Sequence, residues 1–85
     1  MAVNSRLRLT ASGLVCGTPG RLHGFYVSST NVGTLVLYDN TAGSGTQITG
    51  TITPAVGWHA FEADFSVGLY AAIGGTALDV TFVVG

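Results

Sequence analysis

Apolar and polar side chains alternate with a period of two along much of this 85-residue chain. Successive side chains of a β-strand point to opposite faces, so this period predicts strands that bury one face. The first example is the segment 6–11, in which three apolar residues face three polar ones: Leu7, Leu9 and Ala11 against Arg6, Arg8 and Thr10. No segment of about ten or more residues shows a helical stripe, so the pattern indicates an all-β chain.

Short segments with strand character follow one another along the chain, separated by turns rich in Gly, Pro, Asn and Asp. The turn signals include Gly74-Gly75, which predicts a tight hairpin, and Gly24 predicts a bulge or a close approach of backbones. The expected strands are 6–11, 14–16, 21–28, 34–39, 46–53, 58–67, 68–73 and 77–84. We therefore expect a compact antiparallel β-sandwich, jelly-roll-like, of about eight short strands, with a small antiparallel barrel as the other economical arrangement.

The length allows one domain, because a second hydrophobic core could not be built from the remaining chain. We expect residues 1–85 to form a single sandwich domain. Residues 1–12 would serve in it as an N-terminal strand or as an arm in partner contacts.

Charge is scarce. Charged residues make up 8% of the chain, against about 25% in ordinary soluble domains, and there is no lysine. Spread over the surface of a folded monomer, this is roughly one charge per 680 Å². So thin a coat disfavours a free monomer and indicates a component of an assembly, since uncharged strand faces can be covered without burying charges.

The same balance argues against two classes of partner. The net charge of −1 offers no basic patch for phosphates, so we expect no direct binding of nucleic acid. The chain has no run of about 18 apolar residues, so we expect no membrane contact. The arginines Arg6, Arg8 and Arg21 are the only permanent side-chain cations, and they are the candidate contacts to a protein partner.

Groups that could carry catalysis are few. Cys16 and His23 are a chemically sensible nucleophile and base, but neither lies in a nucleophile motif. On one strand, Glu62 and Asp64 would share a face while His59 points the other way, so the three could not bind one metal ion without a bulge. The glycine-rich turns lack the lysine and helix of a phosphate loop. We predict a protein without enzymatic activity, catalytic residues, metal or cofactor.

Between Gly20 and Val84 the chain resembles small virion structural proteins of tailed bacteriophages. The resemblance lies in the residues and the order of four stretches: Gly20–Phe25, the hairpin Leu35–Thr46, Thr53-Pro54, and Gly68–Ala77 followed by a valine-rich last strand. It implies a head decoration or cement protein, which is a β-sandwich, commonly a homotrimer, that binds the major capsid protein on the capsid exterior and reinforces the shell.

Two other functions stay open. The first is a carbohydrate-binding tail or fibre module that uses Trp58 and Tyr38 as stacking surfaces, since exposed aromatic rings bind sugars as well as protein partners. The second is a neck or tail adaptor of the same particle. The aromatic residues that could form a stacking platform are Phe25, Tyr26, Tyr38, Trp58 and Tyr70.

Overall fold

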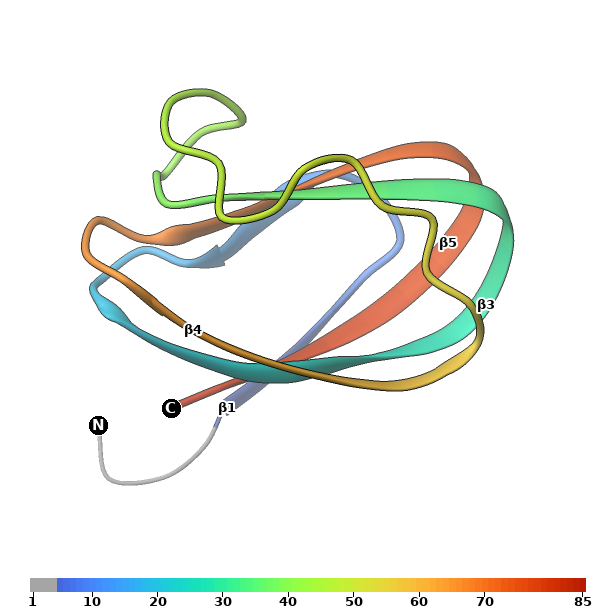
Figure 1. Ribbon diagram of the computed structural model, residues 1–85, viewed down its shortest axis with the longest axis horizontal. Coiled ribbons are helices and arrows are strands. Elements are labelled where there is room, and N and C mark those ends of the chain that lie inside the picture. Colours follow the sequence, from blue (N-terminus) through green and yellow to red (C-terminus); the bar gives the residue numbers. More distant parts are fainter. Residues whose placement is uncertain (1–4) are drawn as a thin grey trace.

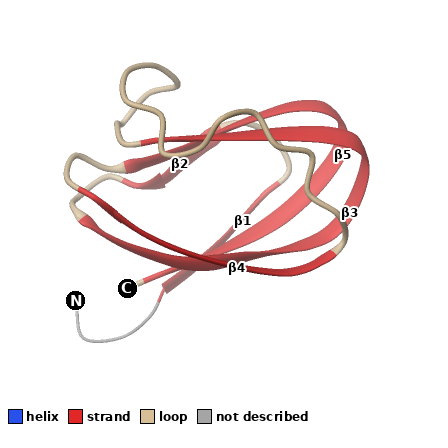
Figure 2. Cartoon of the chain, viewed as in Figure 1, coloured by secondary structure: helices blue, strands red, loops and turns tan. Residues whose placement is uncertain are grey.

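The computed structural model describes residues 5–85, and within that range the side chains of all but Ser5, Asn31, Thr76 and Ala77. The described chain contains no helix, and its antiparallel strands enclose one core (Figure 2). The strands are β1 (Ser5–Leu9), β2 (Gly13–Cys16), β3 (Gly20–Tyr38), β4 (Gly57–Phe65) and β5 (Leu69–Val84).

Two strands, β3 and β5, are long and take part in both layers of the fold. They pair with each other from Leu22↔Val84 to Tyr38↔Tyr70, and the register shifts between Val27 and Thr34. At this shift both ribbons bend and turn back over themselves, as Figure 1 shows in teal and green for β3 and in orange and red for β5. Each long strand therefore contributes one half to each of two stacked sheets.

The first sheet has the order β1-β5-β3-β4, and the second is built from β2 with the other halves of β5 and β3. This arrangement confirms the predicted all-β antiparallel sandwich. Counted as halves, the long strands give seven strand segments in place of the expected eight.

The missing strand is the expected segment 46–53. This segment runs alongside β3 but pairs with it only through two isolated bridges, Leu35↔Ile52 and Tyr38↔Gln47, and through irregular backbone hydrogen bonds between these bridges. Ile48 and Ile52 nevertheless pack against the core.

The predicted hairpin at Gly74-Gly75 is wrong, because β5 continues through these residues. Gly75 has a φ of 73°, and Val32 on the paired strand has a φ of 57°. Both values lie in the left-handed region, so the paired strands change direction together without losing their ladder. The two glycines therefore mark a bend inside a strand. The expected strands 68–73 and 77–84 are the two halves of β5.

The core lies between the sheets, and its residues follow the predicted alternation in β4 and in the second half of β5. In β3 a bulge at Gly24 brings Leu22 and Phe25 to the same buried face, as the glycine predicted. The buried apolar residues are Leu22, Phe25, Val27, Leu35, Leu37, Phe65, Leu69, Ala71, Leu78, Val80, Phe82 and Val84.

The expected N-terminal segment 1–12 lies partly outside the described residues, since residues 1–4 are not described. Its next part is β1, which pairs with β5 from Ser5↔Val84 to Leu9↔Val80. Residues 5–9 therefore form an edge strand of the first sheet.

The bend generates a prediction for Gly75→Ala. A Cβ at this position would collide with the carbonyl oxygen of Val32, and alanine disfavours the positive φ. We expect the free energy of unfolding to fall by about 1–3 kcal/mol, measured by urea denaturation. Gly50→Ala is the control, because a Cβ there meets nothing within 4 Å. Equal stability of the two variants would contradict the account of the bend.

Candidate functional site

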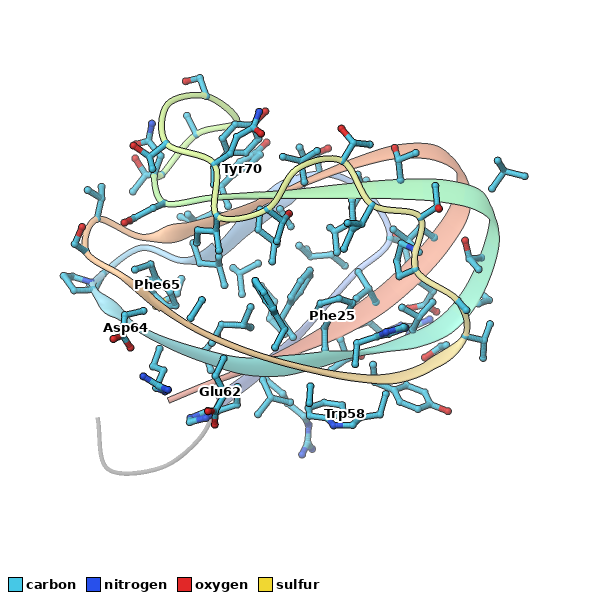
Figure 3. The ribbon with its side chains drawn as sticks, in the orientation of Figure 1. Phe25, Trp58, Glu62, Asp64, Phe65 and Tyr70 are labelled. Atoms are coloured by element: carbon cyan, nitrogen blue, oxygen red, sulfur yellow. The ribbon has the colours of Figure 1, made fainter. Side chains whose placement is uncertain are left out.

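The outer side of the first sheet carries six of the seven charged residues. On β3, β4 and β5 they alternate with buried or half-buried positions, so their side chains point away from the core, and on β1 the two arginines alternate with Leu7 and the half-buried Leu9. In Figure 3, Trp58, Glu62 and Asp64 project outward from β4, whereas Phe25 and Phe65 lie between the layers. We call this surface the charged face; it comprises Arg6, Arg8, Arg21, Glu62, Asp64 and Asp79, with Tyr26 and Trp58.

Arg8 on β1 and Asp79 on β5 form a two-pronged ion pair across neighbouring strands. Arg8 Nε lies 2.8 Å from Asp79 Oδ1, and Arg8 Nη2 lies 2.6 Å from Oδ2. The two donated hydrogen bonds and the positive charge of Arg8 hold the pKa of Asp79 below its ordinary value. The guanidinium of Arg8 is therefore already engaged within the chain.

Arg21 on β3 is engaged in the same way by two carboxylates of β4. Arg21 Nη1 lies 2.8 Å from Asp64 Oδ1, and Nη2 lies 3.4 Å from Glu62 Oε1. Arg6, by contrast, forms no ion pair with any residue that the structure describes. Of the three predicted partner contacts, which all lie on the charged face, Arg6 alone keeps its charge available to a neighbour.

Trp58 and Tyr26 lie side by side on the charged face. They are direct cross-strand partners on β4 and β3, and their exposed fractions are 52% and 46%. Gly24 on β3 leaves room for the indole, because a Cβ there would come within 2.6 Å of Trp58 Cζ2. The Trp58 side chain therefore reaches across to the neighbouring strand and lies along the sheet.

Trp58 and Tyr38, the two residues named as stacking surfaces, do not lie side by side. Tyr38 pairs with Tyr70 in the half of β3 that belongs to the second sheet, and Figure 3 places Tyr70 on the opposite outer surface from Trp58. Phe25 lies in the core, stacked on the His59 ring with 5.1 Å between the ring centroids. Tyr26 is thus the partner of Trp58, and the glycine at position 24 was the sequence signal for close packing at this place.

The outer side of the second sheet has a different character, and we call it the uncharged face. Its outward positions, from β2, β3 and β5, contain no charged residue in the described chain. Leu14 on the edge strand β2 is 43% exposed, and Tyr70 lies beneath the loop that contains Gly43. The residues of the uncharged face are Leu14, Thr34, Val36, Tyr38, Tyr70 and Ala72.

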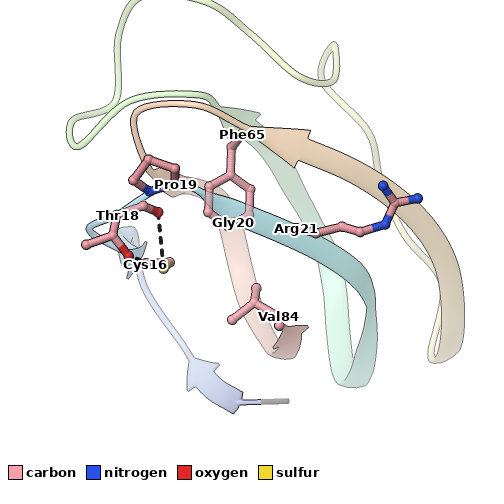
Figure 4. A pocket seen from close by; sticks show the side chains of 8 residues that line it. Cys16, Thr18, Pro19, Gly20, Arg21, Phe65 and Val84 are labelled. Carbon is pink, nitrogen blue, oxygen red and sulfur yellow. Dashed lines mark hydrogen bonds between the residues drawn. The ribbon is translucent and has the colours of Figure 1, made fainter. Parts of the chain in front are cut away.

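A cavity of about 220 Å³ opens at one end of the sandwich, and its lining includes Cys16, Phe65 and Arg21 (Figure 4). The Cys16 thiol donates a hydrogen bond to the carbonyl oxygen of Thr18, with 3.4 Å between the atoms. His23 is absent from the lining of this cavity. Cys16 lies on β2 in the second sheet, and His23 lies in the part of β3 that pairs with β4 in the first sheet. The thiol and the imidazole considered as a catalytic pair therefore belong to different sheets.

Glu62 and Asp64 share the outer face of β4 while His59 points to the other side, as the alternation predicted. His59 Nε2 lies 2.7 Å from the carbonyl oxygen of Ala55. Within residues 5–85, no three His, Cys, Asp or Glu side chains are close enough to hold one metal ion. The same residues include no helix of the length and apolar character needed to span a membrane.

Comparison with models of protein families, with curated proteins and with solved structures finds no match to this chain. Its function is therefore inferred from its residues and their geometry.

The seventh charge, Asp39, closes the turn between β4 and β5. Its carboxylate accepts hydrogen bonds from the backbone N–H groups of Ser66 and Val67, at 3.0 and 2.9 Å, and from that of Gly68 at 3.4 Å. The Ser66 hydroxyl donates another, at 3.1 Å. These donors, the Ser66 and Val67 N–H groups first, lower the pKa of Asp39 below its ordinary value of 3.8.

The lowered pKa of Asp39 predicts how stability depends on pH. A carboxyl group with a folded-state pKa below its unfolded value stabilises the fold above that value, and the contribution disappears as the pH falls through the folded pKa. We expect Asp39→Asn to be less stable than the wild type at pH 7, and this difference to shrink at about pH 2. Urea denaturation at both pH values measures it.

Ser66→Ala is the control for Asp39→Asn, because it removes one hydroxyl donor and leaves the carboxylate in place. It should retain most of the pH dependence of the wild type. If the wild type and Asp39→Asn differed by the same amount at both pH values, Asp39 would not be acting through its charge.

Proposed function

We propose that this protein is a non-enzymatic structural protein of a tailed-phage virion. It decorates the exterior of the head as an oligomer, binds the major capsid protein, and stabilises the shell. The resemblance of residues 20–84 to small virion proteins and the scarcity of charge support this function.

The observation that carries the proposal is the separation of the two outer surfaces. Covering the uncharged face desolvates no ionised side chain, so protein–protein contact there avoids the largest cost of burying a polar surface. The interior parts of protein interfaces are likewise poor in charged residues and rich in aromatic ones, and Tyr38 and Tyr70 lie on this face. We assign the uncharged face to contacts between copies and with the shell, while the charged face stays in water except at the edge strand β1, where Arg6 lies.

Arg6 has a separate place in this arrangement. It lies on β1, at the edge of the first sheet, and no described carboxylate neutralises it. A carboxylate of a neighbouring subunit would complete it. Binding to the assembled shell in preference to its free subunits then stabilises the shell by mass action.

The oligomer is tested by size-exclusion chromatography with light scattering. We expect a multiple of the 8.7 kDa chain mass, and a trimer in particular. Leu14→Arg should shift the protein toward monomer, because it places a charge at an exposed position of the uncharged face. Ala60→Arg, on the outer side of β4, is the matched control and should leave the oligomer intact. A wild-type monomer at micromolar concentration would contradict the proposal.

The role in the particle is tested by heating virions that have been stripped of the protein. We expect them to release DNA at a lower temperature than intact virions, and added purified protein to restore the original temperature. Unchanged release would count against a cement function. Cryo-electron microscopy of the intact particle would separate the alternatives, since a protein present only at one vertex or along the tail is an adaptor or a fibre module.

A further inference from the structure

We propose that Trp58 and Tyr26 form a binding site for a neutral sugar ring of a glycan. The site lies on the charged face and does not depend on the function proposed for the uncharged face.

The first argument is the position of the indole. Trp58 extends from β4 over Gly24 of β3. A Cβ atom at Gly24 would lie only 2.6 Å from Cζ2 and 2.7 Å from Cη2 of the indole, so the ring occupies the space of a side chain at this position. The Cζ2–Cη2 edge of the indole is thus packed on the backbone of β3, while half of the residue's surface remains exposed. An indole held along a sheet in this way offers its outer surface to a ligand at little further cost in conformational entropy.

The second argument is the width of the platform. Tyr26 is the direct cross-strand partner of Trp58, and neighbouring strands lie about 4.8 Å apart. Two exposed aromatic side chains therefore leave the same face of neighbouring strands at adjacent positions, so one sugar ring can reach both. Thr81 on β5 is the cross-strand partner of Tyr26 on its other side. The hydroxyl groups of Thr81 and Tyr26 can each donate and accept hydrogen bonds.

The third argument is charge. The charged face carries three arginines and three carboxylates, so its charges balance, and Arg8 and Arg21 are already paired within the chain. Such a surface has no net charge, yet it offers hydrogen-bond donors and acceptors to the hydroxyl groups of a ligand. A nucleic acid would bring phosphates toward Asp64, Glu62 and Asp79 with few free cations in return, so a neutral polyhydroxylated ligand fits better.

A protein partner is the competing occupant of this surface. Covering the charged face with a second copy would bury ion pairs along with the aromatic rings, which costs desolvation free energy. A single sugar ring would cover Trp58 and Tyr26 and leave Arg8–Asp79 and Arg21–Asp64 in water. The aromatic pair lies near the start of β4, whereas Asp64 lies near its end and Arg8 and Asp79 lie on β1 and β5, and this separation favours the sugar.

The test uses the intact chain on an array of neutral and acidic glycans, followed by titration of each neutral hit against the fluorescence of Trp58, the one tryptophan. We expect neutral glycans to bind and to change the emission. Trp58→Ala and Tyr26→Ala should each weaken binding on the array by about tenfold. Val67→Ala, which shortens an exposed apolar side chain in the turn between β4 and β5 and outside both faces, is the control and should bind as the wild type does.

Circular dichroism melts of all the variants verify that each one folds. Gly24→Ala should also weaken binding, since a methyl group there collides with the indole and with the carbonyl oxygen of His59 on β4. Retention of binding by Trp58→Ala, binding of acidic glycans or oligonucleotides alone, or an array without any hit would overturn the proposal. So would Trp58 emission that changes with protein concentration and ignores sugars, because a second copy would then cover the indole.

Discussion

The pairing of β3 with β5 is the interaction on which the rest of this structure depends. These two strands remain hydrogen-bonded through a shared bend, so that a single ladder supplies the centre of both sheets. The bend requires left-handed backbone at Val32 and Gly75, and Gly75 lies too close to the Val32 carbonyl to carry a side chain. With the central ladder in place, β1, β2 and β4 need only add to its edges. An 85-residue chain thereby builds a two-layer core with few connections.

The bend also explains why the two outer surfaces differ. A strand that crosses from one sheet to the other keeps one side toward the core throughout, while its outward side belongs first to one surface and then to the opposite one. Arg21 and Tyr26 therefore lie on one surface, and Val36 and Tyr38, further along the same strand, lie on the other. The charges of β1, β4 and the end of β5 join the first surface, since these elements belong to the first sheet.

The alternation of side chains predicted the fold class and most inward-facing positions, because burial depends on a local period that the sequence displays directly. It could not predict how strands pair. Gly74-Gly75 is compatible with a hairpin or a bend, and only the ladder to β3 selects the bend. For the same reason the alternation could not show that Tyr26, and not Tyr38, lies beside Trp58. Which aromatic side chain lies beside Trp58 depends on the alignment of β3 with β4, and a contact between strands more than thirty residues apart leaves no local signal.

Gly24 links the fold to the candidate site. Its bulge brings Leu22 and Phe25 to the core side of β3, and its missing side chain makes room for the Trp58 indole on the outer side. A larger residue would disturb both surfaces of the strand at once, so the position of the aromatic pair is a consequence of how the core is packed.

The scarcity of charge is also reflected in the structure, in how the few charged residues are distributed. Six charged residues gathered on one surface leave the other with none in the described chain, and that surface is the one that assembly can cover at least cost.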